Sequence, residues 1–304
     1  MKKLPLPFLA ASLLVFLAGV SPIRAELIVG LTTDNRITLF DSLTPGAATA
    51  PIAITGLGAG ESMVGIDRRP QNGPNNGLLY GLTISGGTGR VYTVSETTGA
   101  ATLVSTLSVS LTGNTFGVDF NPVPDRLRVV SDLDQNLRIN VDTGATLVDG
   151  TLAYAGSDPN AGANPNIVAV AYNNNFGGAT TTTLRDIDSN LDIVAIQNPP
   201  NTGTLNTAAS LGFNTTDSVG FDVSGLSGTP YFSFILAGES FSRFYSFSGG
   251  SFNNMGPVGT GLALFDIAAP VGVPTPEGGP GLLGLLALGL VTFAGTKLNR
   301  RASA

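Results

Sequence analysis

A short motif recurs along this chain at an almost constant interval, and this repetition constrains the fold more than any other feature. Its fullest version is Gly117-Val118-Asp119-Phe120-Asn121-Pro122. Related segments surround Asp67, Ala171, Asp222 and Asp266, so that successive markers are 52, 52, 51 and 44 residues apart. A period near 50 residues is typical of repeat architectures, in which each repeat forms one supersecondary unit.

Each repeat has the pattern of four short strands. In the second copy, β-branched or alternating runs are separated by Pro, Asp and Gly, and they span 116–121, 126–131, 136–140 and 146–151. The first copy has corresponding runs at 64–68, 78–84, 89–95 and 101–107. In the third copy, runs at 180–187, 191–196 and 205–211 follow the motif. A four-stranded antiparallel unit repeated around an axis is a propeller blade.

The last copy of the motif lies too close to the end of the repeat region to be followed by three more strands. Three strand-like runs without a motif stand instead near the start of the chain, at 26–31, 35–41 and 49–56. A C-terminal inner strand completed by N-terminal strands would remove the free edges of the ring. We therefore predict an all-β, five-bladed β-propeller over residues 26–270. The alternatives are an open solenoid, a two-sheet sandwich, or six blades with a miscounted insertion.

Both ends of the chain have the pattern of targeting segments. Residues 1–25 combine a basic start, an apolar run and a small residue at Ala25, which predicts a helical signal peptide. Residues 271–280 form a linker rich in Pro and Gly. Residues 281–304 combine an uncharged stretch with a basic tail, which predicts a transmembrane helix with its cations in the cytoplasm. An uncleaved N-terminal anchor helix is the alternative for residues 1–25.

The order of linker motif, apolar helix and basic tail resembles the PEP-CTERM class of bacterial sorting signals. The candidate sorting motif is Val273, Pro274, Pro276 and Glu277, where the usual Val-Pro-Glu-Pro is replaced by Val-Pro-Thr-Pro-Glu. The resemblance implies an exosortase-type processing enzyme as partner and membrane attachment before processing. It also implies delivery to the cell surface or extracellular matrix. A plain C-terminal membrane anchor is the alternative.

Composition excludes several classes of function. Residues 26–272 hold 20 acidic residues against nine Arg and no Lys, so the domain repels nucleic acid. The chain contains neither Cys nor His. It therefore forms no disulfides, lacks the usual ligands of zinc, copper and haem, and cannot build a catalytic triad that needs His or Cys.

The aspartates of the repeat form the first candidate site. Asp67, Asp119, Asp222 and Asp266 occupy equivalent positions, and Ala171 interrupts the set. Carboxylates at equivalent points of the inner strands can converge near the axis and bind Ca²⁺, the one cofactor that this sequence suggests. The favoured alternative is that each Asp accepts backbone N–H groups in the turn after its strand. Strand alternation places Asp119 opposite Val118 and Phe120, which predicts a position at a blade edge.

Two acidic segments resemble calcium loops less closely. Residues 186–192 carry alternating oxygen ligands, but Leu191 and Gln197 stand where a calcium loop needs glycine and glutamate. A hairpin turn between two strands is the favoured interpretation. The group Asp132, Asp134 and Asn136 makes a weaker case of the same kind.

Arginines provide the remaining candidates. Arg126 and Arg128 share a strand face, and Arg68, Arg69 and Arg138 complete the group. Such a pair can bind a carboxylate or an acidic sugar in a bidentate manner. Because acidic residues are abundant, pairing with neighbouring Asp is the favoured alternative. The polar segment from Tyr172 to Asn175 would suit a glycan-binding surface.

Over residues 26–267 the chain resembles the bacterial family called domain of unknown function 4394. The matching segments are 29–35, 117–122, 126–131 and 198–201. The family is uncharacterised, so the resemblance implies an exported context and no particular activity. We predict a non-catalytic binding or structural module, with extracellular polysaccharide as a candidate partner. The alternative is a calcium-dependent propeller hydrolase or lyase, which requires at least three of the four Asp carboxylates to converge within reach of one ion.

Overall fold

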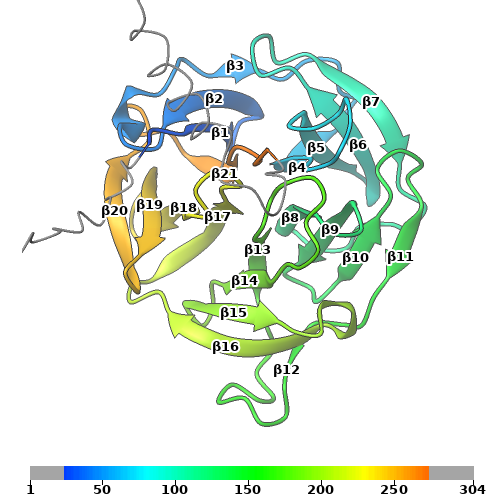
Figure 1. The fold of residues 1–304 in the computed structure, drawn as a ribbon, viewed down its shortest axis with the longest axis vertical. Helices are drawn as coiled ribbons and strands as arrows, with labels where there is room; N and C mark the ends of the chain where they lie inside the picture. Colours follow the sequence, from blue (N-terminus) through cyan, green and yellow to red (C-terminus); the bar gives the residue numbers. More distant parts are fainter. Residues whose placement is uncertain (1–23, 274–304) are drawn as a thin grey trace, which may run out of the picture.

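Five β-sheets surround a central axis in the computed structural model, which describes residues 24–273 (Figure 1). The predicted all-β, five-bladed propeller is confirmed, and the open, two-sheet and six-bladed alternatives are excluded. The described chain contains two short 3-10 helices, η1 (Pro45–Ala47) and η2 (Pro200–Thr202). None of its helices is long and apolar enough to cross a membrane. The predicted signal peptide and C-terminal helix lie outside the described residues.

Four blades follow one another along the chain, each with its first strand innermost. Blade 1 contains β4 (Ser62–Arg68), β5 (Leu79–Ser85), β6 (Thr88–Val94) and β7 (Ala101–Thr106). Blade 2 contains β8 (Phe116–Asn121), β9 (Arg126–Ser131), β10 (Asn136–Ile139) and β11 (Thr146–Val148). Blade 3 contains β13 (Ile167–Tyr172), β14 (Leu184–Asp188), β15 (Ile193–Gln197) and β16 (Thr204–Ser210). Blade 4 contains β17 (Thr215–Val223), β18 (Pro230–Leu236), β19 (Ser242–Ser248) and β20 (Ser251–Pro257).

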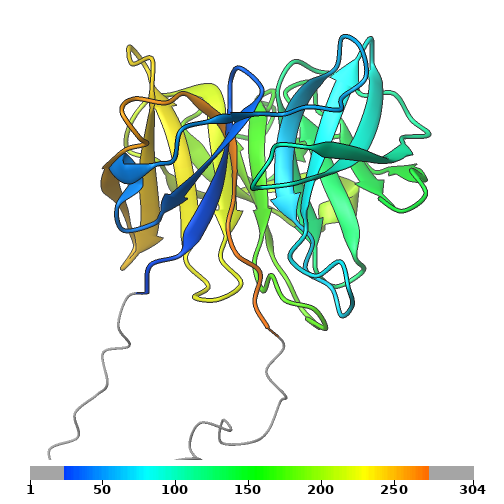
Figure 2. The ribbon, with the colours of Figure 1, turned by 90° about the horizontal axis from the view of Figure 1, so that it is seen from above.

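Blade 5 joins the two ends of the described chain, as predicted. Its inner strand is β21 (Leu264–Ala268), and its outer strands are β1 (Leu27–Thr32), β2 (Arg36–Asp41) and β3 (Ile52–Ala53). Strands β1 and β21 are antiparallel, with Val29 opposite Ala268. Both described ends leave the ring on the same face (Figure 2). Antiparallel pairing across this seam completes the fifth blade and closes the ring.

Blade 3 differs from the prediction in two respects. Strand β14 begins at Leu184 and not at residue 180, because Asn173 accepts hydrogen bonds from Thr182 and Thr183 and holds this segment as a loop. The short strand β12 (Ala153–Tyr154) was not predicted. It pairs in parallel with β16 and adds a fifth strand to the blade. This addition covers the outer edge of blade 3, which would otherwise expose unpaired backbone groups.

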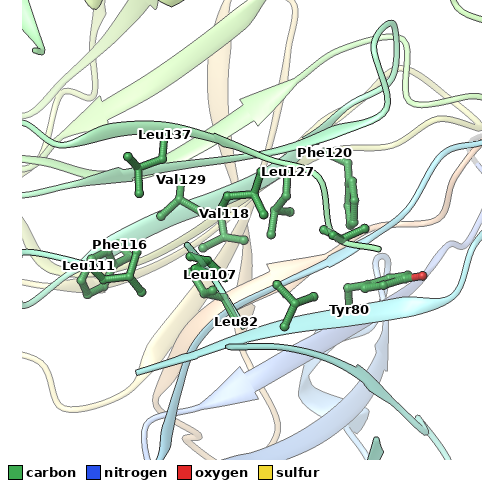
Figure 3. Close-up of a cluster of buried hydrophobic side chains, with 13 residues drawn as sticks. Tyr80, Leu82, Leu107, Leu111, Phe116, Val118, Phe120, Leu127, Val129 and Leu137 are labelled. Atoms are coloured by element: carbon green, nitrogen blue, oxygen red, sulfur yellow. The ribbon is translucent and has the colours of Figure 1, made fainter. Parts of the chain in front are cut away.

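The hydrophobic core lies between neighbouring blades. Figure 3 shows the cluster between blades 1 and 2, where Tyr80 and Leu82 of β5 face Val118 and Phe120 of β8. The rings of Tyr80 and Phe120 meet edge to face with their centroids 5.3 Å apart. Buried apolar area of this kind stabilises a fold by about 25 cal/mol per Å². The apolar side chains fill these interfaces between blades. The polar residues of the motif lie on the inner strands, close to the axis.

Candidate functional site: an acidic cluster at the propeller axis

The four aspartates of the repeat are buried on the inner strands. Their exposed fractions are 2% for Asp67, 0% for Asp119, 2% for Asp222 and 6% for Asp266. Each stands on the innermost strand of its own blade, so the repeat of the sequence becomes a ring of carboxyl groups around the axis. This arrangement follows directly from the equal spacing of the motif and the closure of the ring.

Each carboxylate of the ring accepts a hydrogen bond from the inner strand of the following blade. The accepted backbone N–H groups and their N···O distances are Phe120 to Asp67 (2.7 Å), Tyr172 to Asp119 (3.0 Å), Ala269 to Asp222 (2.6 Å) and Ile66 to Asp266 (2.9 Å). The expectation that the Asp residues accept backbone N–H groups is therefore correct. The donors that link the blades lie on the neighbouring strand, however, and not in the turn after each Asp.

In blades 1, 2 and 4, glycine stands two residues before the Asp and allows this contact, whereas Leu264 takes that position in blade 5. Residues i and i+2 of a strand point to the same face, so Gly117 and Asp119 both face blade 3. A Cβ atom on Gly117 would lie 2.8 Å from the backbone nitrogen of Val170, and one on Gly220 would lie 2.7 Å from that of Ile267. Any larger residue would separate the inner strands. The Gly-x-Asp pattern therefore combines close approach with an acceptor for the neighbouring backbone.

Blade 3 has no carboxylate in the ring, because Ala171 occupies the equivalent position. Asn175, just beyond the end of β13, bridges the same gap. Its side-chain Nδ2 donates to Asp222 Oδ1 at 3.1 Å and to the carbonyl oxygen of Val223 at 3.0 Å. A neutral amide thus links blade 3 to blade 4. Sequence analysis missed this role, since Asn175 stands four residues after the aligned position and was considered only as part of a glycan surface.

Three of the four carboxylates converge on one point. Asp67, Asp119 and Asp222 each offer an oxygen, and these oxygens lie within 4.8 Å of one another. Two buried oxygens nearby accept no hydrogen bond within the described part of the chain: Oδ2 of Asp119 and Oδ1 of Asn175. Buried polar atoms without a partner are rare and costly, so these two oxygens are candidate ligands for a further group.

Burial and mutual repulsion act on the ionisation of this cluster. Burial raises the pKa of Asp67 and of Asp119 well above the usual range, and the charges of Asp222 and Asp67, respectively, raise them further. Burial also raises the pKa of Asp222 to about 7, although two backbone hydrogen bonds oppose this shift. Burial raises the pKa of Asp266 as well. The cluster must therefore either retain protons or bind a cation.

The donor set fits a hard divalent cation. Carboxylate and amide oxygens are the ligands of Ca²⁺ and Mg²⁺, whereas softer metals prefer the imidazole and thiolate groups that this chain lacks. Asp67, Asp119, Asp222 and Asn175 are the residues that would hold such an ion. Ca²⁺ takes six to eight oxygens in flexible geometry, so it tolerates a ligand set assembled from four blades.

The two calcium-loop candidates form turns instead. Asp188 Oδ1 accepts hydrogen bonds from the backbone N–H groups of Asn190 and Leu191, which closes the hairpin between β14 and β15. The favoured hairpin interpretation is therefore confirmed. Asp132 lies in the turn after β9, and it accepts the N–H groups of Asn114 and Thr115 in the segment that precedes β8. In the described chain neither group supplies a set of three converging carboxylates.

Most of the candidate arginines pair with acidic residues, as expected. The ion pairs are Arg68 with Glu96, Arg69 with Asp125 and Asp142, and both Arg128 and Arg138 with Asp149. Arg126 differs, because its guanidinium donates to the carbonyl oxygens of Pro124 and Asp125. Arg128 is 1% exposed, so it does not present a surface for an acidic sugar.

The candidate sorting motif falls at the end of the described chain. Val273 is described and is 75% exposed, just after the propeller ends. Pro274, Pro276 and Glu277 lie outside the described residues. The proposed linker therefore begins on the face of the ring from which both described ends emerge (Figure 2).

The fold and the axial carboxylates define a five-bladed β-propeller with an acidic centre. The chain belongs to the family Domain of unknown function (DUF4394), whose model matches residues 36–268. No curated protein matches the sequence.

Among solved structures, the calcium-binding protein regucalcin from Agrobacterium tumefaciens is 14% identical. The match covers 78% of each chain with a TM-score of 0.42. Sqt1 from Saccharomyces cerevisiae is 10% identical over 79% of this chain and 72% of its own, with a TM-score of 0.37. A protein from Lactobacillus plantarum is 13% identical over 78% and 83%, with a TM-score of 0.35. Likenesses this distant carry no information about ligands.

Proposed function

We propose that this protein is an exported, non-catalytic binding or structural module whose blades are held together at the axis by a buried Ca²⁺ ion. One observation carries the proposal. The carboxylates that converge at the axis are buried and bonded to the backbones of neighbouring blades. The role of such groups is to stabilise the ring.

The calcium-dependent hydrolase or lyase meets one of its requirements, because three of the four carboxylates converge. It fails another, since a catalytic group must touch the substrate. Asp67, Asp119 and Asp222 are at most 2% exposed, and each carries a hydrogen bond from a neighbouring blade. A substrate would have to displace part of the inner ring to reach them. The geometry therefore favours a structural role for the cluster.

Targeting supports the exported part of the proposal. Residues 1–25 would direct secretion, and Val273, Pro274, Pro276 and Glu277 would be recognised by an exosortase-type enzyme while residues 281–304 hold the chain in the membrane. The exposure of Val273 suits such recognition. The propeller would then act at the cell surface or in the extracellular matrix, with extracellular polysaccharide as its partner. Its excess of acidic residues opposes any role with nucleic acid.

Thermal unfolding of the full chain with and without Ca²⁺ tests the axial site. At a Ca²⁺ concentration a hundredfold above Kd, binding to the folded state alone stabilises it by about 3 kcal/mol. For a domain of this size that corresponds to roughly 6–12 °C in melting temperature. K⁺ at the same ionic strength should give no comparable shift. An unchanged melting temperature on adding Ca²⁺ to cation-stripped protein would leave the carboxylates as protonated links between blades.

A separate measurement tests export. Mass spectrometry of the protein from a bacterium that has an exosortase should give a mature chain that begins near Glu26 and ends before residue 281. Replacement of Pro274 and Pro276 by Ala should leave the C-terminal segment attached. A product that retains both ends of the chain would argue against the proposed processing.

A further inference from the structure

Exposed apolar side chains gather on the face of the ring from which both described ends of the chain leave. This terminal face is formed by the turns that follow the first and third strands of each blade, and Figure 2 shows the loops after β4, β13 and β17 on it. Six exposed large apolar residues lie here: Leu27, Leu43, Leu78, Val123, Leu226 and Val273. Their exposed fractions run from 40% to 75%, so they are open to a partner.

The six residues are spread around the ring. Leu43 follows β2 of blade 5, and Leu78 directly precedes β5 of blade 1. Val123 lies in the turn between β8 and β9 of blade 2, and Leu226 lies in the turn between β17 and β18 of blade 4. A small groove would gather such residues from one or two neighbouring blades. Their distribution over four blades fits a broad, flat partner instead.

The end of the described chain is fixed in the middle of this face. The backbone N–H group of Gly272 donates to the carbonyl oxygen of Asn175 at 2.7 Å. A Cβ atom on Gly225 would lie 2.2 Å from the backbone nitrogen of Gly272, so the two segments are in close contact. Leu226 and Val273 directly follow these two glycines. The chain therefore leaves the ring among the exposed apolar side chains.

The turns of the terminal face carry no isolated charge. Those after β2, β13, β15, β17 and β19 contain no charged residue. Those after β4, β6, β8 and β10 hold one each: Arg69, Glu96, Asp125 and Asp142. Arg69 pairs with both aspartates, and Glu96 pairs with Arg68. Such turns lose less favourable hydration on leaving water than turns with unpaired charges do.

The opposite face is acidic. The turns between the second and third strands of the blades hold five acidic residues and no basic one: Asp34, Asp132, Asp134, Asp192 and Glu239. The negative charge of the domain is therefore distributed unevenly between its two faces. A surface with negative charge repels the acidic face and so turns the terminal face towards itself.

We infer that the terminal face lies against a lipid bilayer. A bilayer surface is broad and flat, so it meets apolar side chains from four blades at once. Apolar groups that bind in this way lie about 5–10 Å into the boundary between headgroups and acyl chains. Anionic headgroups would repel the acidic face and keep it in water.

The inference rests on the proposed function, in which residues 281–304 hold the chain in the membrane. Residue 281 follows Val273 by eight positions, and eight residues span at most about 30 Å. This short tether would keep the terminal face close to the bilayer and make even weak contacts effective. Contact of the face with the bilayer would also hold the sorting motif at the membrane surface, where its processing enzyme would meet it.

Single-cysteine labelling tests the inference, because the chain contains no Cys. The full chain is reconstituted in vesicles of phosphatidylcholine and phosphatidylglycerol with a nitroxide lipid, which quenches a fluorophore close to the bilayer. L226C and V123C place the fluorophore on the terminal face. L133C is the matched control, since Leu133 is 61% exposed in a turn of the opposite face. About a twofold loss of fluorescence is expected for the first two and none for the third.

A second pair of variants tests whether apolar contact holds the face to the bilayer. L226D in the V123C background places a charge on the face and should remove roughly half of the quenching at residue 123. L133D in the same background should leave the quenching unchanged. Both positions are exposed, so the fold should be retained. Equal quenching in these two double variants would overturn the inference.

Sedimentation of the vesicles separates this inference from the proposed function. A chain that sediments with vesicles but shows no quenching at residues 226 and 123 would overturn the inference and keep the proposed membrane attachment. Equal quenching at all three labelled sites would overturn it as well. A chain that does not sediment would reject both proposals. Labels at residue 226 that quench one another without nitroxide lipid, and lose nothing further with it, would identify a second copy as the partner and overturn the inference.

Discussion

Two neighbouring residues of β17 show two different ways of holding a blade in place. Phe221 turns to one face of the strand and stacks on Phe232, with ring centroids 4.3 Å apart and an angle of 11° between the ring planes. Asp222 turns to the other face and joins the acidic cluster at the axis. Because successive side chains of a strand point to opposite faces, two consecutive residues contribute to an aromatic interior and to a cluster of buried carboxylates.

The two regions respond to different variables. The aromatic interior of blade 4 depends on buried apolar area, which is insensitive to pH and to metal ions. The axis depends on the charge state of Asp67, Asp119 and Asp222, which protons or a cation can alter. We therefore expect mutations in the first region to act equally in all solutions, and mutations in the second to act only in some.

The largest effect is expected from F234A. Phe234 is fully buried, and its ring lies 5.1 Å from that of Phe213 and 5.6 Å from that of Tyr245. The lost burial and the cavity should lower the free energy of unfolding by about 3–5 kcal/mol. Urea denaturation should show the same loss with and without Ca²⁺. The exposed Leu226 is the control, and L226A should change stability by less than about 0.5 kcal/mol.

The substitution D119N should abolish the response to Ca²⁺. It removes one of three converging carboxylates, so the stabilisation of about 3 kcal/mol expected at a hundredfold excess over Kd should disappear. The cation-free protein should keep its stability, because the amide still accepts the Tyr172 N–H and is neutral, like the protonated carboxyl group that it replaces. D186N is the matched control, since Asp186 is equally buried and lies outside the cluster. A full Ca²⁺ response in D119N would contradict the axial site.

The substitution N175A should cost about 2 kcal/mol, because it removes two buried hydrogen bonds, one to Asp222 and one to the carbonyl oxygen of Val223. The free energy of unfolding from urea denaturation measures this loss. Asn190 is exposed and its side chain makes no hydrogen bond within the described chain, so N190A should be close to neutral. Equal effects of the two substitutions would show that Asn175 does not link blades 3 and 4.

The smallest expected effect is a dependence on pH. Burial raises the pKa of Asp222 to about 7 in the folded protein, from an ordinary value of 3.8. The folded state therefore holds a proton that the unfolded state has lost. The stability that this proton provides is present at low pH and disappears as the pH rises through about 7. Without a cation, the free energy of unfolding should fall by about 1 kcal/mol between pH 6 and pH 8.

Saturating Ca²⁺ should remove this fall, because the ion favours the ionised carboxylates. F234A should shift the whole curve without changing its slope. The chain contains no His or Cys, which simplifies the interpretation of this pH range. A cation-free protein that gains stability from pH 6 to pH 8 would contradict the direction derived for Asp222.

The repeat could be predicted from the sequence because its period was visible, and the same pattern identified the four aspartates. The pattern did not reveal the hydrogen-bond donors of these aspartates. The backbone N–H groups of Phe120 and Tyr172 donate across the boundary between two blades, and the alternation of side chains along one strand does not predict such contacts. Asn175 escaped prediction for a related reason. It belongs to no recognisable motif, and it gains its role only from neighbours brought close by the fold. Strand β12 was missed because two residues are too few to form a periodic pattern.

Closure of the ring sets the order in which the chain can fold. Strand β1 pairs with β21, so the contact between Val29 and Ala268 cannot form before the end of the chain is available. The hydrogen bonds from Ile66 to Asp266 and from Ala269 to Asp222 also need β21 in place. Contacts between such distant parts of a chain form slowly. In a chain still crossing a membrane, the edge of β1 that pairs with β21 would stay unpaired until this last strand had emerged. Occupation of the axial site would therefore report that folding is complete.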